Sequence, residues 1–321
     1  MTGADVINDL VSVIITTKNE ENNIEMCLKS VNCQSYKTIE IIVVDNQSAD
    51  KTKEIAAKFT DLIYNKGPER SAQRNFGVSV SGGEYVIYID ADMILAPFVI
   101  ESCVAEFKSD TLLVGLYIPE IILGRGLFCR TRRFERSFYN ATPIDAVRFV
   151  KKDIFIKANG FDERFSAAED WDFNRKVSNL GKLKLLGSYK VSSCEKKENE
   201  EENIFSKEIV NFLISNGINS KDLYNKYNNV IFHNETSITL SKYFSKKSYY
   251  MKGFDIYINK WGKNDIIIKK QFGLLYRYLL VFIEGSKWKK LLRHPLLTLY
   301  MYFLKGAVGF VYVKHKMFKI S

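Results

Sequence analysis

Short apolar runs alternate with segments of helical periodicity along the first third of the chain. The runs at residues 11–16, 39–44 and 85–90 are rich in β-branched residues. Strands buried on both faces of a parallel sheet have this composition, because helices cover each side. Residues 20–31 and 50–59 carry apolar positions three and four residues apart, as amphipathic helices do. The alternation predicts a Rossmann-like α/β fold with a mostly parallel sheet and flanking helices.

The pattern is less regular beyond residue 110. Residues 112–118 predict a further strand, and residues 159–177 predict a loop followed by a helix. A charged run at residues 195–203 has no apolar period and predicts a solvated loop, which a short amphipathic helix at residues 204–214 follows. We therefore predict a first domain over residues 1–241 that contains a charged insertion at about residues 195–229.

The C-terminal part carries two apolar tracts, at residues 272–283 and 295–313. Only Arg277 and Lys305 interrupt them, and lysines and aromatic residues flank them, which is typical of helices at a membrane interface. One alternative is that residues 295–313 cross the bilayer once, although Lys305 near their middle would cost about 3 kcal/mol. Another is a buried pair of helices. We predict a basic, apolar, helical membrane-associating region over residues 242–321.

Charge is unevenly distributed along the chain, which has 321 residues and a formal net charge of +10. Residues 242–321 contain 17 Lys and Arg against 3 acidic residues, whereas residues 1–241 have a net charge of −4. The lysines are interleaved with apolar tracts and lack a nucleic-acid-binding motif. An anionic membrane surface therefore accounts for the basic region better, and nucleic acid is not an expected partner.

Composition and cysteine usage limit the class of protein and the cellular compartment that we expect. With 46% hydrophobic and 26% charged residues, the chain can bury a core and is not disordered. Its five cysteines are scattered without a CxxC pair, so neither a disulfide framework nor a zinc cluster is predicted. The first residues do not resemble a secretory signal. We expect the protein at the cytoplasmic face of the cell membrane, bound as a peripheral or monotopic protein.

Acidic residues follow the predicted strand at residues 85–90. Asp90 and Asp92 are separated by one residue, and two carboxylates so placed can serve a divalent cation and a sugar nucleotide. Open α/β sheets bind ligands at the carboxyl ends of their strands, which supports a site here. The first strand is followed by TTKNEEN and not by GxGxxG, which disfavours a dinucleotide oxidoreductase. Alone, the two aspartates are more consistent with a solvated turn than with a site.

Four sequence blocks occur in one order with compatible spacing: SVIITTKNEENNI, VVDNQSADKT, GPERSAQRNFGVSVSGGEYVIYIDADMIL and GFDERFSAAEDWDF. Together they resemble the family-2 glycosyltransferases, which are inverting enzymes of the GT-A fold. The resemblance covers about residues 11–187. It implies a GT-A glycosyltransferase domain within residues 1–241 and a nucleotide-linked sugar as the donor.

The resemblance also implies donor-binding residues. Thr17 and Glu20 match the first-strand motif that holds the nucleoside, and Asp45 matches the aspartate that pairs with the base. Arg74 matches the arginine near the base and pyrophosphate, and Asp90 matches the carboxylate that contacts the sugar nucleotide.

Asp92 matches the direct ligand of Mg²⁺ or Mn²⁺, and His233 resembles a third ligand that many relatives carry after their acidic pair. A surface histidine without a ligand is the alternative for His233. Asn46 stands where a second acidic residue is usual and Gln47 where glycine is common, so the resemblance is weaker for the base and ribose contacts.

The acidic pair Glu169-Asp170 matches the family motif whose aspartate is the proposed general base, and Glu169 would position the acceptor or the loop. The alternative is an acid pair at a helix N-terminus, where the macrodipole favours it. A base is needed for a hydroxyl acceptor, whereas a polyprenyl phosphate is already anionic. We expect transfer from a UDP- or GDP-linked sugar to a hydroxyl of a membrane-held, lipid-linked glycan. The alternatives are transfer to polyprenyl phosphate and a catalytically inactive, membrane-tethered binding module.

Overall fold

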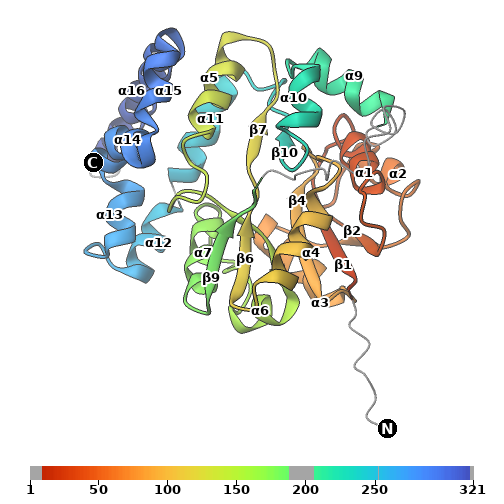
Figure 1. Cartoon of the computed structure of the whole chain (residues 1–321). Helices are drawn as coiled ribbons and strands as arrows, with labels where there is room; N and C mark the ends of the chain where they lie inside the picture. The colour runs from red at the N-terminus through yellow and green to blue at the C-terminus, as the bar shows by residue number, and fades with distance from the viewer. Residues whose placement is uncertain (1–8, 188–205, 252, 319–321) are drawn as a thin grey trace.

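The computed structural model describes residues 9–187, 206–251 and 253–318, and its centre is a seven-stranded, mostly parallel sheet with helices on both faces (Figure 1). The strand order is β3-β2-β1-β4-β8-β6-β9. The bounds of these strands are β1 Val11–Thr17, β2 Ile39–Asp45, β3 Ile63–Asn65, β4 Tyr85–Asp90, β6 Leu113–Tyr117, β8 Val147–Lys151 and β9 Lys182–Leu185. β8 is antiparallel to β4 and β6, and the remaining neighbours are parallel.

A second sheet has three short strands in the order β5-β10-β7, with bounds β5 Met93–Leu95, β7 Glu120–Ile122 and β10 Ile231–His233. The strands predicted at residues 11–16, 39–44, 85–90 and 112–118 are confirmed as β1, β2, β4 and β6. The second sheet was not predicted. Its strands have three residues each, which is too short for an alternating or continuous apolar run to stand out.

Successive residues of β1 point to opposite sides of the large sheet. Both sides therefore present apolar side chains, and helices cover each of them. Val11, Val13 and Ile15 face one core, which α1 and α4 complete, whereas Ile14 faces the other, which α3, α6 and α7 complete. The bounds of the helices up to residue 225 are α1 Ile24–Asn32, α2 Thr52–Ala56, α3 Arg70–Val80, α4 Val99–Ser109, α5 Leu127–Arg136, α6 Lys152–Lys157, α7 Glu169–Ser178, α9 Lys207–Ser215 and α10 Ser220–Asn225.

Two predicted helices are shorter in the structure than in the sequence pattern. α1 begins at Ile24 instead of residue 20, and α2 covers only five residues of the predicted 50–59. The reason is tertiary, since the two loops bind each other: the Glu20 amide donates to Thr52 Oγ1 at 2.8 Å, and Asn19 adopts a positive φ of 55°. Of the predicted insertion at about residues 195–229, residues 195–205 lie outside the described residues, and the rest contains α9, α10 and a loop.

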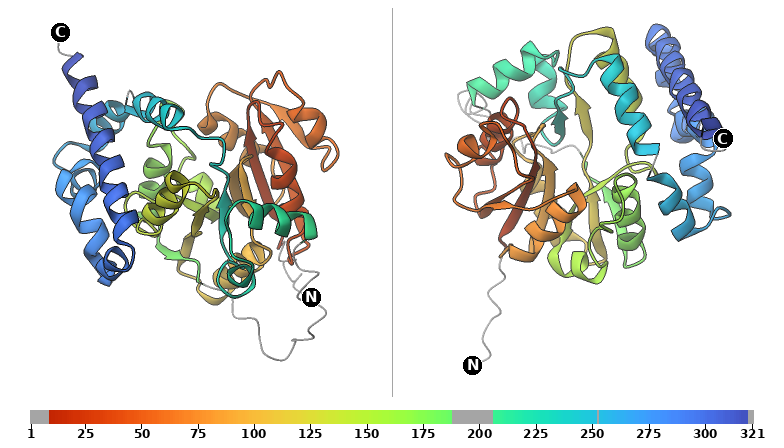
Figure 2. Two further views of the ribbon diagram at one scale, coloured as in Figure 1. Left: turned by 90° about the horizontal axis from the view of Figure 1, so that it is seen from above. Right: turned by 180° about the vertical axis from the view of Figure 1, so that it is seen from behind.

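The C-terminal part forms a helical layer beside α5 and α7. Its elements are α11 Leu240–Met251, α12 Phe254–Trp261, α13 Ile266–Phe272, η1 Tyr276–Leu280, α14 Val281–Ile283, η2 Glu284–Ser286, α15 Trp288–Arg293 and α16 Pro295–Phe318. Figure 2 shows α16 as a long helix at the outer edge of the molecule. Within the described residues, no helix is both long enough and apolar enough to cross a bilayer.

The first C-terminal helices pack on α7. Trp171 stacks on Phe254 with ring centroids 5.8 Å apart and meets Phe272 edge-on at 5.7 Å. The Arg175 guanidinium donates to both carboxylate oxygens of Asp265, at 3.0 and 2.9 Å. The boundary at residue 241 stays a prediction, but the described helices on its C-terminal side supply part of the packing of α7.

Helix α3 approaches β1 closely because Gly77 has no side chain. A Cβ atom at Gly77 would lie 2.4 Å from Ile14 Cγ2 and 3.2 Å from Val44 Cγ2. We expect Gly77→Val to lower the free energy of unfolding by roughly 1–3 kcal/mol, because α3 must move away from the sheet. Urea unfolding checks this, with Ser79→Ala on the exposed side of the same helix as the control. Equal stability of the two variants would contradict the close-packing argument.

Candidate active site

The register of the large sheet brings three predicted site residues to one edge. Thr17 at the end of β1 pairs with Asp45 at the end of β2, and the neighbouring Thr16 pairs with Asp90 at the end of β4. Thr16 Oγ1 also donates a hydrogen bond to Asp90 Oδ1 at 2.8 Å. The carboxyl ends of three adjacent parallel strands therefore present polar side chains to the same side, where such sheets bind ligands.

Two arginines on one face of α3 connect Asp90 to the acidic pair of α7. Arg74 donates to Asp90 Oδ1 at 3.0 Å and to Asp170 Oδ1 at 2.8 Å. One turn earlier, Arg70 lies 2.9 Å from Glu169 Oε1 and 3.5 Å from Asp90 Oδ2. The spacing of four residues places both guanidinium groups on the same side of the helix. Residues that are up to 100 positions apart in sequence thus share one site.

Arg74 is fully buried, and aromatic rings hold its guanidinium in place. The rings of Tyr88 and Phe161 lie with their centroids 5.1 Å from the Arg74 Cζ atom. Its Nε atom is buried and has no hydrogen-bond partner among the described atoms. Burial opposes ionisation of Asp90, but Arg74, Arg70 and Arg148 outweigh it and lower the pKa of that carboxyl well below its usual range. Asp90 is therefore ionised at neutral pH.

The two members of the acidic pair differ in accessibility. Asp170 keeps a quarter of its side-chain surface exposed, so a group arriving from solvent can reach it. Glu169 is almost completely buried, and burial raises its pKa although Arg70 acts in the opposite direction. The residue directly before α7, Ala168, adopts the left-handed conformation, with a φ of 64°. The geometry gives Asp170 access to a substrate and makes Glu169 the anchor of Arg70.

Asp92 and His233 lie together although 141 positions separate them. β5 and β10 pair antiparallel with His233 opposite Met93, and this places His233 Nε2 3.2 Å from Asp92 Oδ2. On its other side, His233 Nδ1 lies 3.8 Å from Glu120 Oε2, and Arg136 and Arg148 bind Glu120. The small sheet thus assembles the two predicted metal ligands next to the end of β4.

The charges around His233 favour its protonated form. Burial opposes the imidazolium, but the Asp92 carboxylate and the hydrogen bonds to Asp92 and Glu120 outweigh it and raise the pKa of His233 to about 10. Asp92 Oδ1 is buried and has no hydrogen-bond partner among the described atoms. Among the described residues, no three His, Cys, Asp or Glu side chains gather closely enough to hold a metal ion by themselves.

The predicted nucleoside-binding residues are placed at the same edge with different surroundings. The Thr17 hydroxyl is buried and has no hydrogen-bond partner among the described atoms. Asp45 is fully buried and accepts hydrogen bonds from the Ser48 amide at 2.8 Å and from the Ser48 hydroxyl. Burial and the charges of Asp92 and Asp90 raise the pKa of Glu20, against a hydrogen bond from Asn23. Their roles in holding a base or ribose stay predictions.

Sequence reasoning missed three residues beside this site. Arg70 was overlooked although it stands four residues before Arg74 in the same block, which is the spacing of one helical face. Tyr250 of α11 contributes a hydroxyl 3.5 Å from Arg70 Nη2. Lys246, one turn earlier on α11, is partly desolvated, but Tyr250 and Asp92 raise its pKa. The Lys- and Tyr-rich composition of residues 240–251 was the available signal.

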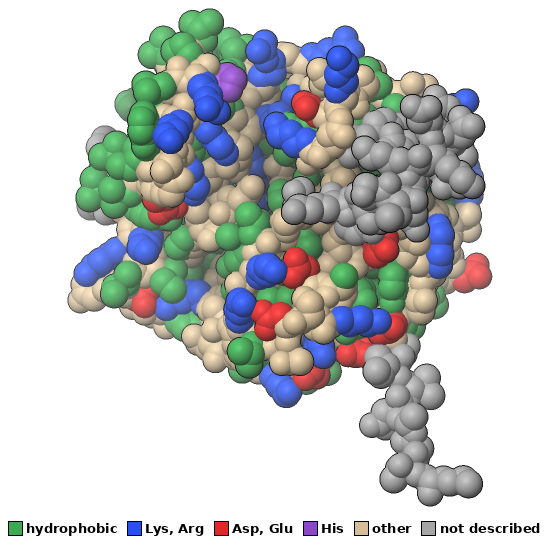
Figure 3. Space-filling view, viewed as in Figure 1, with side chains coloured by type: hydrophobic (Ala, Val, Ile, Leu, Met, Phe, Trp, Pro, Cys, Tyr) green, Lys and Arg blue, Asp and Glu red, His purple; other side chains and the backbone are tan. Residues whose placement is uncertain are grey.

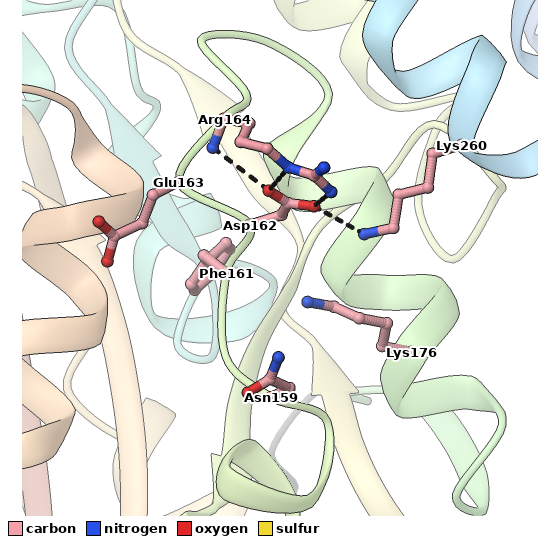
Figure 4. Close-up of a pocket in the computed structure, with 7 residues that line it drawn as sticks. All are labelled: Asn159, Phe161, Asp162, Glu163, Arg164, Lys176 and Lys260. Atoms are coloured by element: carbon pink, nitrogen blue, oxygen red, sulfur yellow. Dashed lines mark hydrogen bonds and ion pairs between the residues drawn. The ribbon is translucent and has the colours of Figure 1, made fainter.

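A cavity of about 370 Å³ lies elsewhere, between the loop before α7 and the helices α7 and α12 (Figure 4). Its lining residues are Asn159, Phe161, Asp162, Glu163, Arg164, Lys176 and Lys260. Charges there are already paired, since Lys260 Nζ lies 2.9 Å from Asp162 and 2.7 Å from Asp172. None of the predicted site residues lines this cavity, and its ion pairs join α12 to α7 and to the loop before α7.

Known proteins share both the sequence and the fold of this chain. Residues 12–164 match the model of the family described as glycosyl transferase family 2. Glycosyltransferase AglE of Haloferax volcanii is 41% identical over 91 residues, which are 26% of this chain and 30% of AglE. Glycosyltransferase GlyG of Streptococcus pneumoniae is 29% identical over 191 residues, which are 56% of this chain and 57% of GlyG. The alignments thus span less than two thirds of each of these relatives.

A solved structure extends the likeness beyond the matched residues. The mannosyltransferase PcManGT from Pyrobaculum calidifontis, in complex with GDP-Man and Mn²⁺, aligns with 96% of this chain and 82% of its own. The TM-score is 0.50 and the sequence identity 16%, so the likeness concerns the fold. The seven-stranded sheet and its covering helices are therefore an architecture that a known glycosyltransferase also has. Residues 12–164, which include Arg74, Asp90 and Asp92, therefore form a glycosyl transferase family 2 region.

Proposed function

We propose that the protein transfers a sugar from a nucleoside-diphosphate donor to an acceptor hydroxyl, with inversion at the sugar C1 atom. The observation that carries the proposal is the Arg74 guanidinium, which joins Asp90 at the donor edge to Asp170 on α7 within a single site. In the proposed reaction, the acceptor oxygen bonds to C1 as the bond from C1 to the diphosphate oxygen breaks. The hydroxyl proton passes to the Asp170 carboxylate, which acts as the general base.

The residues present fit a divalent cation of the Mg²⁺ or Mn²⁺ type. Asp92 Oδ1 is a buried oxygen without a described partner, and His233 would supply a nitrogen beside the same carboxylate once the ion displaces its proton. Glu20 adds a third carboxyl group near Asp90 and Asp92, since burial and, after it, the charges of Asp92 and Asp90 raise its pKa. Such cations are commonly held by one or two carboxylates, with phosphate oxygens and water completing the shell. When bound, the ion would supply positive charge to the leaving diphosphate.

Cations of the protein itself surround the place proposed for the diphosphate. Arg70 lies at hydrogen-bond distance from Glu169 and near Asp90, with a third of its side chain exposed. Lys246 of α11 is near enough to Tyr250 and Asp92 for their charges to raise its pKa, although burial acts in the opposite direction. We infer that these two side chains bind the diphosphate oxygens, because charge-assisted hydrogen bonds from Arg and Lys are the usual means of holding phosphates. PcManGT carries GDP-Man, and a UDP- or GDP-linked sugar is proposed as the donor here.

The acceptor is proposed to be a lipid-linked glycan at the cytoplasmic face of the membrane. Two features support this choice. Asp170 remains accessible as a base, which a hydroxyl acceptor needs and an anionic phosphate acceptor does not. The basic and apolar helices beyond residue 240 also lie next to the site, since α11 carries both Lys246 and Tyr250.

We expect Asp170→Asn to lower turnover by roughly 10²- to 10⁴-fold, because an amide cannot take up the hydroxyl proton. Donor affinity should change little, since Asp170 is assigned to the acceptor side. Steady-state transfer with a radiolabelled donor and calorimetric donor binding measure the two quantities separately. Asp153→Asn, on the exposed side of α6, is the control. Turnover close to the parent rate would point to a phosphate acceptor and would remove the base from the mechanism.

We expect Asp92→Asn and His233→Ala each to weaken Mn²⁺-dependent nucleotide binding by at least about tenfold, because each removes a donor atom for the ion. Calorimetry with UDP and GDP, with Mn²⁺ or with EDTA, measures the effect. Asp153→Asn again serves as the control. Unchanged metal-dependent affinity in both variants would exclude this pair from the metal site.

We expect Lys246→Gln to weaken donor binding by about tenfold, which corresponds to the loss of one charge-assisted contact with the diphosphate. Lys242→Gln, an exposed lysine on the same helix, is the matched control and should leave binding unchanged. Titration with donor and with the free nucleoside separates diphosphate contacts from base contacts. An equal effect of both substitutions would show that only the general charge of α11 matters.

A further inference from the structure

The outer face of the C-terminal helices exposes apolar side chains that no described segment covers. Among the residues whose exposure the structure describes, ten large hydrophobic side chains are more than 60% exposed, and eight of them lie between Ile266 and Phe310. In Figure 3, hydrophobic side chains gather along the edge of the molecule that these helices form. A concentration of this kind marks an interaction surface, because single exposed apolar residues are normally scattered.

Helix α16 shows how the face is built. Leu296, Leu299, Phe303 and Phe310 are exposed, and their spacing places them along one side of the helix. On the opposite side, Met301, Leu304 and Lys305 are buried against α5 and its neighbours. The helix therefore presents apolar residues to solvent as well as to the protein.

The charge in the middle of α16 does not interrupt this face. Lys305 Nζ lies 3.4 Å from Glu135 Oε1 and 3.2 Å from the Tyr139 hydroxyl, both contributed by the end of α5 and the turn after it. Lys305, which argued against a bilayer crossing in the sequence, is thus turned inwards and paired. No cation has to enter an apolar phase when the outer side of α16 is covered.

A hollow between α11 and α16 continues the apolar face. It encloses about 530 Å³, and Phe244, Phe303, Gly306 and Phe310 are among the residues that line it. Its lining carries no charged side chain. An extended hydrocarbon chain would find apolar contacts along it.

Cations border the apolar residues. Residues 266–311 contain eight Lys and Arg and one acidic residue, Glu284. Lys289, Lys290 and Arg293 of α15 are exposed close to Leu292 and Leu296. A second copy of the chain would bring the same cations against each other across a two-fold contact. An anionic headgroup layer above a hydrocarbon layer complements both the charges and the apolar residues.

We propose that the outer face of α13–α16 docks on an anionic phospholipid bilayer, with Leu299, Phe303 and Phe310 at the acyl boundary and the α15 cations at the headgroups. This docking does not depend on the transfer reaction. One consequence, which rests on the proposed function, is that α11 lies between the bilayer and the donor site. A lipid-linked acceptor would then reach Asp170 from the membrane side.

Flotation of the full chain with vesicles tests the proposal. We expect binding to phosphatidylcholine vesicles that contain phosphatidylglycerol, with weaker binding to pure phosphatidylcholine and at high salt. Leu299→Gln with Phe303→Gln should lower partitioning at least tenfold. Leu112→Gln with Ile156→Gln, at equally exposed apolar sites outside this face, should have no effect. Lys289→Gln with Arg293→Gln should lower affinity for anionic vesicles by roughly fivefold per cation.

Three further measurements keep the test decisive. Thermal unfolding should be the same for every variant, because the substituted side chains point away from the core. Metal-dependent nucleotide binding should also be unchanged, which separates a failure of docking from a failure of the proposed function. Equal flotation of the Leu299/Phe303 variant and the parent would overturn the proposal. So would a dimer in sedimentation experiments that this variant abolishes while the parent fails to float.

Discussion

The site depends on the neutralisation of clustered carboxylates by two arginines of α3. Asp90, Glu169 and Asp170 approach one another closely, and without Arg70 and Arg74 their repulsion and desolvation would oppose the folded arrangement. Arg74 is fully buried, so its charge is compensated only by these partners. Because Gly77 lets α3 approach β1, the helix can bring both guanidinium groups over the end of β4. The same contacts therefore fix the position of α3 and the separation of the proposed donor and base residues.

Helix α7 is held from two sides, and this gives the C-terminal helices a structural role. Arg74 and Arg70 bind its first residues, while Trp171 and Arg175 pack against α12 and α13. Asp170, the proposed base, thus lies between the two arginines of α3 and the aromatic cluster that α12 and α13 form with Trp171. A protein shortened at residue 241 would lose that cluster. Full-length variants with substitutions only on the outer face of the C-terminal helices therefore separate membrane docking from catalysis more clearly.

Ion pairs connect the proposed metal site, at the small sheet, to the C-terminal helices. His233 contacts Asp92 on one side and Glu120 on the other, and Arg136 of α5 binds Glu120. Glu135, also on α5, pairs with Lys305 of α16. Polar side chains of α5 therefore contact two regions. Arg136 contacts the proposed metal site through Glu120, and Glu135 contacts α16, whose outer side is proposed to meet lipid. Helix α5 therefore supports both the proposed metal site and the proposed membrane-docking face. Metal binding and membrane docking can still occur independently of each other.

The sequence by itself determined the parallel strands β1, β2 and β4 and the position of Asp90 and Asp92 at the end of one of them, because these follow from continuous apolar runs and strand-end chemistry. Only the tertiary structure placed His233 beside Asp92, since a three-residue strand has no periodic signal and its partner is 141 positions away. It also decided that Arg70 faces Glu169 and that Lys305 turns inwards to Glu135. Periodicity records which positions are apolar, whereas the partner of a buried charge is set by packing between distant segments.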